Sequence, residues 1–492
     1  MGRVLNLYLV AFPLIGLFRL THPITGDEAT NILLYSSDWR TLFSRTYPNN
    51  HVVSSVFGYL LSNALGYNVI VFRLVSLVSA LSLSLLVWAY LVREKHILAA
   101  IISLTVIYAT PLFLPYSSLF RGYVVQMVLA FSGAAQLYDY VMYRKLSSLV
   151  VSSVLFGVGM IHMLTTIYIW VPALISLFIC RHNKGDLVRY VRVLLPVGIA
   201  IALMYSVSII VTGYAVVRPE TPNVGDLFTR LNRAPHLLLS LGFDKVFLHE
   251  ALNPSTTLNA YLESVLWQVG DSPHYYVALC ALIVTVLVVW ASPLREKSRS
   301  VMAFASFVAF CVGIQVFLHR PLPERTLLMY LPFFAVLIGL TFERIGALSP
   351  LMARLSSGQM LLIASCLCFA VSLSIGWHFL TVDYSKYVDQ VYLPSDTVIK
   401  DLVNDQCDDP ISVDGDAHIR KYIAFYSQQE CNRKWSLKEI RAFIKERRLF
   451  SDASIYIQST NQEVDGIPER AIISESHKVT YQDAHLVVLK RD

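Results

Sequence analysis

Long apolar runs separated by short polar stretches dominate the chain up to about residue 380. As a helix, a run of about 20 residues crosses the roughly 30 Å hydrocarbon core of a bilayer. Such runs occupy 4–20, 67–92, 97–115, 122–143, 193–214, 275–292, 300–318, 326–342 and 359–380. A further run, 146–180, is long enough for two short spans. The pattern predicts a polytopic α-helical membrane protein with about eleven transmembrane helices.

The run 146–180 has basic residues at both ends, Arg144 and Lys145 at one and Arg181 and Lys184 at the other. Because basic residues favour the cytoplasmic side of a membrane, both ends belong on the same side. The run is therefore expected to turn back near His162.

The positive-inside rule fixes the orientation of the remaining spans. With a cytoplasmic N-terminus, the inside connections each contain Lys or Arg; they are 93–96, 144–145, 181–192, 295–299 and 343–358. The first apolar run lacks a small-residue cleavage pattern after it, which indicates a retained span in place of a signal peptide. A first outer loop (21–66), a second large outer loop (215–274) and everything after about 381 then face outward, in a multi-pass protein of the cell (inner) membrane.

The composition changes near Asp383, where charged residues become dense and apolar runs shorten to the length of strands. The runs "ISV", "SIYIQ" and "HLVVLK" alternate with helix-like segments, one of which opens with a capping box at Ser436 and Glu439. We predict a small extracytoplasmic α/β domain at 381–492, following a transmembrane catalytic domain at 1–380. An exported domain permits a disulfide between Cys407 and Cys431, and two unpaired thiols are the equal alternative.

Composition excludes several classes of protein. Of the 492 residues 55% are hydrophobic and 15% charged, and the mean hydropathy is +0.54, which is outside the range of a soluble protein of this length. The net charge of +6 fits cytoplasmic loops beside a membrane, so no nucleic-acid partner is expected. No Walker A, GxGxxG or GxSxG motif occurs, which disfavours a nucleotide-driven pump and a serine hydrolase.

The stretch "TGDE" that starts at Thr25 places two carboxylates side by side at the edge of the first span. Thr25 and Glu28 fit a capping box, in which each side chain bonds the other residue's backbone amide. Because successive residues on a helix point about 100° apart, the box does not need Asp27. A carboxylate at the membrane surface can deprotonate a hydroxyl acceptor, so Asp27 is the candidate general base. Glu28 is the expected cap and also a candidate substrate contact.

Polar residues elsewhere on the outer face are candidates for substrate binding. Asn50 and His51 precede a helix of mixed polarity, where they suit either a phosphate or sugar ligand or ordinary turn and helix-start chemistry. Arg121, with Tyr123 beside it, opens the fourth span; its guanidinium suits a phosphate or simply snorkels to the interface.

A second basic cluster lies in the turn "HRPLPERT", which contains His319, Arg320, Glu324 and Arg325. Basic residues on the outer face run against the positive-inside tendency, so we expect them to bind a polyprenyl phosphate at the bilayer surface. An Arg–Glu pair that anchors the next span is the alternative. No metal-binding spacing such as HExxH or CxxC occurs near the acidic pair; no metal ligand is assigned, no cofactor is certain, and a divalent cation is left open.

In their order along the chain, these features resemble the GT-C glycosyltransferases, in particular the bacterial branch with protein O-mannosyltransferases and aminoarabinose transferases. The shared features are an Asp-Glu pair in the first outer loop, a later histidine before an amphipathic helix, "RGY" at the fourth span and "PER" before a late span. The resemblance covers roughly residues 1–345. It departs from the family where "NNH" replaces the frequent "HPP".

The resemblance implies an inverting transfer of a sugar from a polyprenyl-phosphate donor to a glycan, lipid or protein acceptor. Asp27 would deprotonate the acceptor hydroxyl, and Arg121 and Arg325 would hold the departing lipid phosphate. The same outer-face residues would also suit a transporter or flippase of lipid-linked sugars, but such a protein should carry ionisable residues at mid-membrane depth, where the predicted spans have almost none. A receptor or scaffold would not need the outer cluster of His, Arg and Asp.

Overall fold

The computed structural model describes residues 17, 20, 24–36, 51–110, 113–179, 184–212, 328–348, 403, 411–414, 417–429, 431, 455–459, 477–482 and 486–491. The chain divides into two compact units, which we describe separately. The first contains Met1–Arg19, Phe43–Ser54 and Leu74–Asp383, and the second contains Leu20–Leu42, Ser55–Arg73 and Tyr384–Asp492. The predicted spans at 4–20, 275–292, 300–318 and 359–380 lie largely or wholly outside the described residues.

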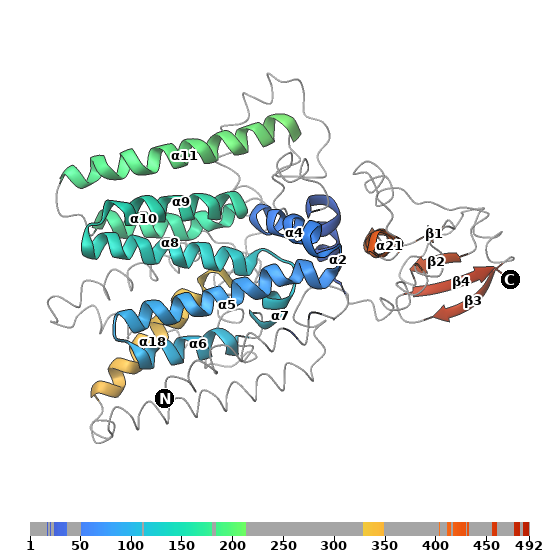
Figure 1. Ribbon diagram of the computed structural model, residues 1–492, viewed down its shortest axis with the longest axis horizontal. Coiled ribbons are helices and arrows are strands. Elements are labelled where there is room, and N and C mark those ends of the chain that lie inside the picture. Colours follow the sequence, from blue (N-terminus) through green and yellow to red (C-terminus); the bar gives the residue numbers. More distant parts are fainter. Residues whose placement is uncertain are drawn as a thin grey trace, which may run out of the picture. The chain divides into compact units, whose positions relative to one another are not determined.

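Helices make up the described part of the first unit (Figure 1). They are α6 (Ile97–Ala109), α7 (Phe113–Ser118), α8 (Tyr123–Tyr143), α9 (Leu146–His162), η3 (Leu164–Thr166), α10 (Ile167–Ile179), α11 (Lys184–Thr212), η5 (Leu328–Tyr330) and α18 (Leu331–Leu348). Helices α4 (Val52–Leu65) and α5 (Val69–Arg93) each contribute residues to both units. The predicted break of the run 146–180 near His162 is confirmed, because α9 ends at that residue and α10 begins after one short 3₁₀ turn.

One predicted span is interrupted, and two helices extend beyond their apolar runs. The span 97–115 is interrupted, since α6 ends at Ala109 and α7 starts at Phe113. Thr110 has extended backbone angles (φ −77°, ψ 115°), as expected for a residue that precedes a proline. Helix α11 begins within the predicted connection 181–192, and α18 continues to Leu348. Arg and Lys are good helix formers, so charged residues at the ends of an apolar run extend the helix.

Small residues bring neighbouring helices close together. Ser152 of α9 donates a hydrogen bond to the carbonyl oxygen of Gly133 in α8 at 2.7 Å. On the other side of α9, a Cβ atom at Gly157 would lie 2.6 Å from Val197 of α11. Close backbone approach through glycine and serine is typical of helices that associate in a membrane. Figure 1 shows α8, α9, α10 and α11 side by side.

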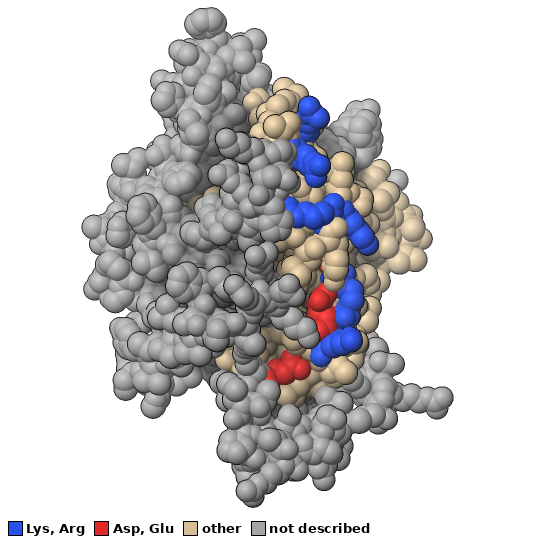
Figure 2. Space-filling view, turned by 90° about the vertical axis from the view of Figure 1, so that its left-hand side faces the viewer, with Lys and Arg blue, Asp and Glu red and all other residues tan. Residues whose placement is uncertain are grey.

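Basic side chains gather at one end of these helices (Figure 2). Helices α5 and α8 end there, and Arg93 of α5 forms two bonds to Asp139 of α8, of 2.6 and 3.0 Å. Tyr140 of α8 also contacts Tyr190 near the start of α11, with 5.9 Å between ring centroids. Exposed cations near this end are Arg93, Lys95, Lys145, Arg189 and Arg192. The described basic residues of the predicted cytoplasmic connections 93–96, 144–145 and 181–192 therefore lie on the same side.

Two helices in the described part of the chain are long and apolar enough to cross a bilayer, namely Val69–Arg93 and Val188–Ser206. The second belongs to α11, where Leu195 and Leu203 are 56% and 61% exposed. Large apolar side chains on an outer helix face are suited to contact with lipid tails.

The second unit contains the short helix α2 (Gly26–Asn31), the π-helix η2 (Ile32–Ser36), helix α21 (Ala417–Gln429) and a small sheet. The strands are β1 (Ile411–Asp414), β2 (Ile455–Ser459), β3 (His477–Gln482) and β4 (Leu486–Arg491), in the order β1-β2-β4-β3. β1 and β2 are parallel, and the other two pairs are antiparallel. Parallel neighbours need a crossover connection, and α21 lies in the one between β1 and β2.

Strands β1, β2 and β4 coincide with the three runs that the sequence indicated as strands, whereas β3 was not predicted. Charged and polar residues make up most of β3, which hides the apolar alternation of a strand. The capping box at Ser436 and Glu439 lies outside the described residues. That 381–492 is a separate domain, and that it faces outward, remain predictions.

Helix α21 packs against α2 and η2 within the second unit. Phe425 of α21 contacts Tyr67, with the ring centroids 5.9 Å apart, and Tyr67 also stands edge-on to Phe72 at 5.2 Å. Tyr67 lies between α4 and α5. Its ring therefore joins α21 to the start of α5.

Close packing of α18 on α6 generates a stability prediction. A Cβ atom at Gly339 would overlap the carbonyl oxygen of Ala99 and the hydroxyl of Ser103. We expect Gly339→Ala to lower the free energy of unfolding by about 1–3 kcal/mol because the helices must move apart. Gly198→Ala is the matched control, since no described atom lies within 4 Å of that position and alanine raises helix stability. Thermal unfolding in detergent tests the prediction, and equal melting temperatures for the two variants would contradict it.

Candidate functional site

Helix α2 carries the acidic pair, and a capping box fixes its start. Thr25 accepts a hydrogen bond from the Glu28 amide at 3.2 Å, and the Thr25 amide donates to Glu28 Oε2 at 3.0 Å. The predicted capping box is therefore confirmed. Asp27 and Glu28 lie in the first turn, where the positive end of the helix dipole favours negative charge.

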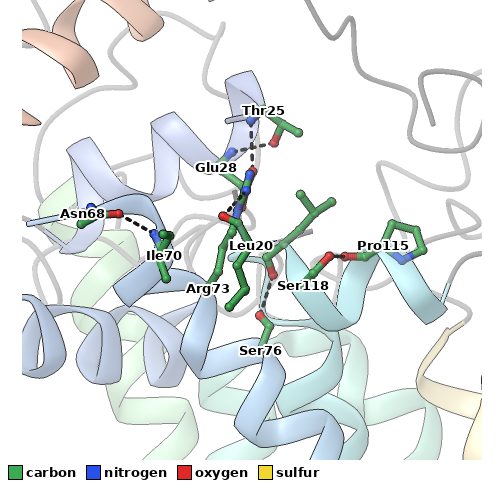
Figure 3. A network of polar contacts seen from close by, with 10 residues as sticks. Leu20, Thr25, Glu28, Asn68, Ile70, Arg73, Ser76, Pro115 and Ser118 are labelled. Atoms are coloured by element: carbon green, nitrogen blue, oxygen red, sulfur yellow. Dashed lines mark hydrogen bonds and ion pairs between the residues drawn. The ribbon is translucent and has the colours of Figure 1, made fainter. Parts of the chain in front are cut away.

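Glu28 also forms a buried ion pair that the sequence did not indicate. Arg73 Nε donates to Glu28 Oε1 at 3.0 Å, and the terminal NH2 donates to Oε2 at 2.8 Å (Figure 3). Both side chains have 0% exposure. The remaining terminal nitrogen of Arg73 donates to the carbonyl oxygen of Leu20 at 3.0 Å. The guanidinium thus ties α2 to the end of the first apolar run with paired, charge-assisted bonds.

The position of Arg73 follows from the way α5 begins. Asn68 accepts a bond from the Ile70 amide at 2.9 Å (Figure 3), which satisfies one of the amides that a helix start leaves unpaired. Arg73 then lies one turn into the helix. An arginine at the start of a predicted span is a signal in itself, because ionisable residues in spans usually have a partner; the sequence could not show that this partner is Glu28.

The two carboxylates differ in their surroundings. Glu28 is fully buried, and Arg73 and the Thr25 amide contact its oxygens. Asp27, one residue earlier and about 100° away around the helix, is half-buried. The geometry therefore gives Glu28 a structural role in holding α2, while its substrate contact and the base role of Asp27 remain predictions.

In the first unit, the predicted residues His51, Arg121 and Tyr123 lie together. The rings of His51 and Tyr123 are 5.4 Å apart, and the Arg121 guanidinium lies 5.8 Å from the Tyr123 ring centroid. Tyr116 packs edge-on against Tyr123 at 4.9 Å. His51 directly precedes α4, as predicted, and Tyr123 is the first residue of α8. The guanidinium lies within cation–π distance of the Tyr123 ring, and a guanidinium also has the geometry to pair with a phosphate.

His162 completes this cluster, although the sequence indicated it only as a turn. It accepts a hydrogen bond from the Val53 amide at Nδ1 (3.2 Å), so its Nε2 carries the proton and donates to the Gly122 carbonyl oxygen at 2.8 Å. Its ring lies 5.8 Å from that of His51. A Cβ atom at Gly122 would lie 2.5 Å from both histidines, so the cluster requires glycine there. The sequence held one signal for this contact: the predicted turn at His162 lies on the side opposite the cytoplasmic connections, as His51 does.

Backbone hydrogen bonds hold Arg121 in place, in addition to its contact with the Tyr123 ring. Its amide donates to the Leu119 carbonyl oxygen at 2.7 Å, and the Ser76 hydroxyl of α5 lies 2.5 Å from the oxygen of Leu119 and 3.4 Å from that of Arg121. The residue is only 3% exposed. A snorkelling arginine would reach water, so this burial favours binding of a ligand or a protein group over snorkelling.

The other predicted site residues, Asn50, His319, Arg320 and Arg325, lie outside the described residues. Within the described part of the chain, no group of three or more His, Cys, Asp or Glu residues is arranged to hold a metal ion. The acidic pair and the His51 cluster belong to different compact units, and we describe each on its own.

The fold is similar to that of ArnT, a protein of solved structure. ArnT from Cupriavidus metallidurans, crystallised with undecaprenyl phosphate, matches with a TM-score of 0.59 and 13% identity over 99% of this chain and 98% of its own. The apo form of ArnT matches with a TM-score of 0.59 and 14% identity over 99% and 97% of the two chains. No protein-family model and no curated protein matches the sequence. The expected resemblance to aminoarabinose transferases of the GT-C family is therefore confirmed at the level of the fold.

The buried pair Glu28–Arg73 should be essential for stability. We expect Arg73→Met to lower the free energy of unfolding by about 3–5 kcal/mol, because it leaves the Glu28 carboxylate buried without its counter-ion. The double variant Glu28→Gln/Arg73→Met should lose less than the sum of the single variants. Glu94→Gln is the control: Glu94 pairs with the 47% exposed Arg93, and such pairs contribute about 0–1 kcal/mol. Denaturant unfolding in detergent measures the stability of the two single variants, the double variant and the control. Similar losses of unfolding free energy for Arg73→Met and Glu94→Gln would refute the prediction.

Proposed function

We propose that the protein is a membrane glycosyltransferase that moves a sugar from a polyprenyl-phosphate donor to a hydroxyl acceptor at the outer face of the cell membrane. The similarity to ArnT supports this proposal most strongly, since it extends over 99% of the chain and includes a structure crystallised with undecaprenyl phosphate. At 13% identity, the similarity is evidence of a shared fold. The chemistry is argued from the residues on α2 and around Tyr123.

Asp27 takes the role of the general base in this proposal. Its carboxylate removes the proton of the acceptor hydroxyl, the oxygen attacks the anomeric carbon, and the bond from that carbon to the phosphate oxygen breaks. The polyprenyl phosphate leaves with the bonding electrons, and the configuration of the anomeric carbon is inverted. The capping box and the Glu28–Arg73 pair hold α2 rigidly, and a general base works only when it is held within hydrogen-bond reach of its proton.

Cationic and aromatic residues would hold the donor. Arg121 with His51 and Tyr123 offers a guanidinium and two rings in contact, a combination suited to a phosphate and the sugar attached to it. Cations beside the leaving phosphate stabilise the charge that develops as the bond breaks. We assign the same role to Arg325, with His319, Arg320 and Asn50 as further substrate contacts.

The proposal includes the predicted orientation. Cys431 is disulfide-bonded, which suits an oxidising, non-cytoplasmic compartment; Cys407 lies outside the described residues. The basic end of α5, α8 and α11 (Figure 2) suits the cytoplasmic side. We therefore assign 1–380 to a transmembrane catalytic domain and 381–492 to an extracytoplasmic α/β domain.

Asp27→Asn should reduce sugar transfer by about 10²–10⁴-fold, the usual contribution of a general base, while expression and melting temperature stay near those of the wild type. Release of undecaprenyl phosphate from a panel of polyprenyl-phosphate sugars, measured on purified protein in nanodiscs, reports the reaction. Asp139→Asn is the matched control, because Asp139 pairs with Arg93 at the basic end.

Near-normal transfer by Asp27→Asn would refute the base assignment. A wild-type protein that moves such lipids across a bilayer without releasing the lipid phosphate would instead favour a flippase.

Arg121→Ala should weaken binding of the donor about 10- to 100-fold, since a hydrogen bond to a charged group contributes about 1.5–3 kcal/mol. The apparent affinity for the acceptor should change little. Titration of the purified protein with undecaprenyl phosphate measures the loss, and the exposed Arg189→Ala controls for removal of one positive charge. If Arg121→Ala and Arg189→Ala both keep the wild-type affinity, Arg121 is not a phosphate ligand.

A further inference from the structure

Asn31 lies one turn after the candidate base, at the last position of α2. Four residues correspond to about 400° of helical rotation, so Asp27 and Asn31 lie about 40° apart on the same face. Asp27 is half-buried, and Asn31 is 2% exposed. The shared face therefore runs from the partly accessible carboxylate to a buried amide.

The buried amide of Asn31 is incompletely satisfied. Its Nδ2 is buried and has no hydrogen-bond partner among the residues that the structure describes. A donor in this state costs free energy, because the bond it made to water in the unfolded chain is not replaced. Buried side-chain amides nearly always have partners, so an unpartnered donor on the same face as a candidate base suggests a residue that binds a polar group of a ligand.

The backbone directly after Asn31 is also unusual. The chain changes there from α2 to the π-helix η2 (Ile32–Ser36), and the Ser36 hydroxyl donates to the Asn31 carbonyl oxygen at 3.3 Å. π-helical turns are rare and occur frequently at functional sites. The irregular turn and the unpaired amide therefore coincide at one residue.

We propose that Asn31 is a substrate-binding residue whose side-chain amide bonds a hydroxyl group of the substrate held at Asp27. This inference rests on the proposed function and adds a residue to it. A neutral amide suits a hydroxyl better than a phosphate, which favours cationic donors. A hydroxyl also both donates and accepts, so it satisfies the amide in either orientation.

The hydroxyl can belong to the sugar of the donor or to the acceptor, and the experiment separates the two. Full-length Asn31→Leu is compared with the wild type in nanodiscs. One arm measures the affinity for bare undecaprenyl phosphate and for undecaprenyl phosphate carrying a hexose or an aminopentose. The other arm measures KM for the acceptor that supports release of the lipid phosphate. The control is Asn63→Ala, because Asn63 is exposed and its amide donates to the Tyr59 carbonyl oxygen at 2.8 Å.

We expect Asn31→Leu to keep or raise the melting temperature, because leucine removes an unpaired donor without changing the shape much. Either the affinity for the sugar-carrying lipid should fall about three- to tenfold, with bare lipid unaffected, or KM for the acceptor should rise by a similar factor. The first result assigns the hydroxyl to the donor sugar, and the second assigns it to the acceptor.

Unchanged affinity and KM would overturn the inference, as would a lowered melting temperature in both Asn31→Leu and Asn31→Ala, since a purely structural asparagine behaves in that way. Failure of the proposed function is distinguishable. The wild type would then neither bind nor use any lipid-linked sugar of the panel, and the role of Asn31 would fall with it.

Discussion

The geometry of helix α2 depends on one buried ion pair. Arg73 holds both oxygens of Glu28 with neither side chain exposed, and Glu28 in turn caps the helix through Thr25. Two buried charges are stable only when they are paired and their remaining bonds are satisfied. The pair joins residues 45 positions apart, so it fixes where α2 lies within its unit and thereby where Asp27 and Asn31 lie.

In the first unit, hydrogen bonds from side chains to backbone groups fix the helix ends, as the Glu28–Arg73 pair fixes α2 in the second. His162 bonds the carbonyl of Gly122 and the amide of Val53, and Ser76 bonds the carbonyl of Leu119. The bond from Val53 satisfies a backbone donor that the start of α4 leaves unpaired, and the other two join side chains to carbonyl groups beside helix ends. The ends of α4, α8 and α9 are thereby held together, and Arg121 and Tyr123 sit at a junction that the surrounding helices make rigid. A site for a substrate benefits from such support because little ordering remains to be done on binding.

The proposed chemistry separates the roles of neighbouring residues on α2. Glu28 stabilises the helix, Asp27 is proposed to move a proton, and Asn31 is proposed to orient a hydroxyl. Adjacent residues on a helix point in different directions, so a short helix can face the protein on one side and a substrate on another. The contact of α2 with α21 also brings the C-terminal segment against the element that carries the candidate base.

Local patterns determined much of this protein from the sequence alone. Apolar run lengths located most described helices, the spacing of Thr25 and Glu28 gave the capping box, and basic residues at both ends of 146–180 gave the turn at His162. These features depend on residues close in the sequence. The tertiary structure alone decided that Arg73 pairs with Glu28, that His162 joins His51, and that the amide of Asn31 is buried without a described partner. Each depends on contacts across the fold or on burial, and neither spacing nor periodicity encodes which distant residues will meet.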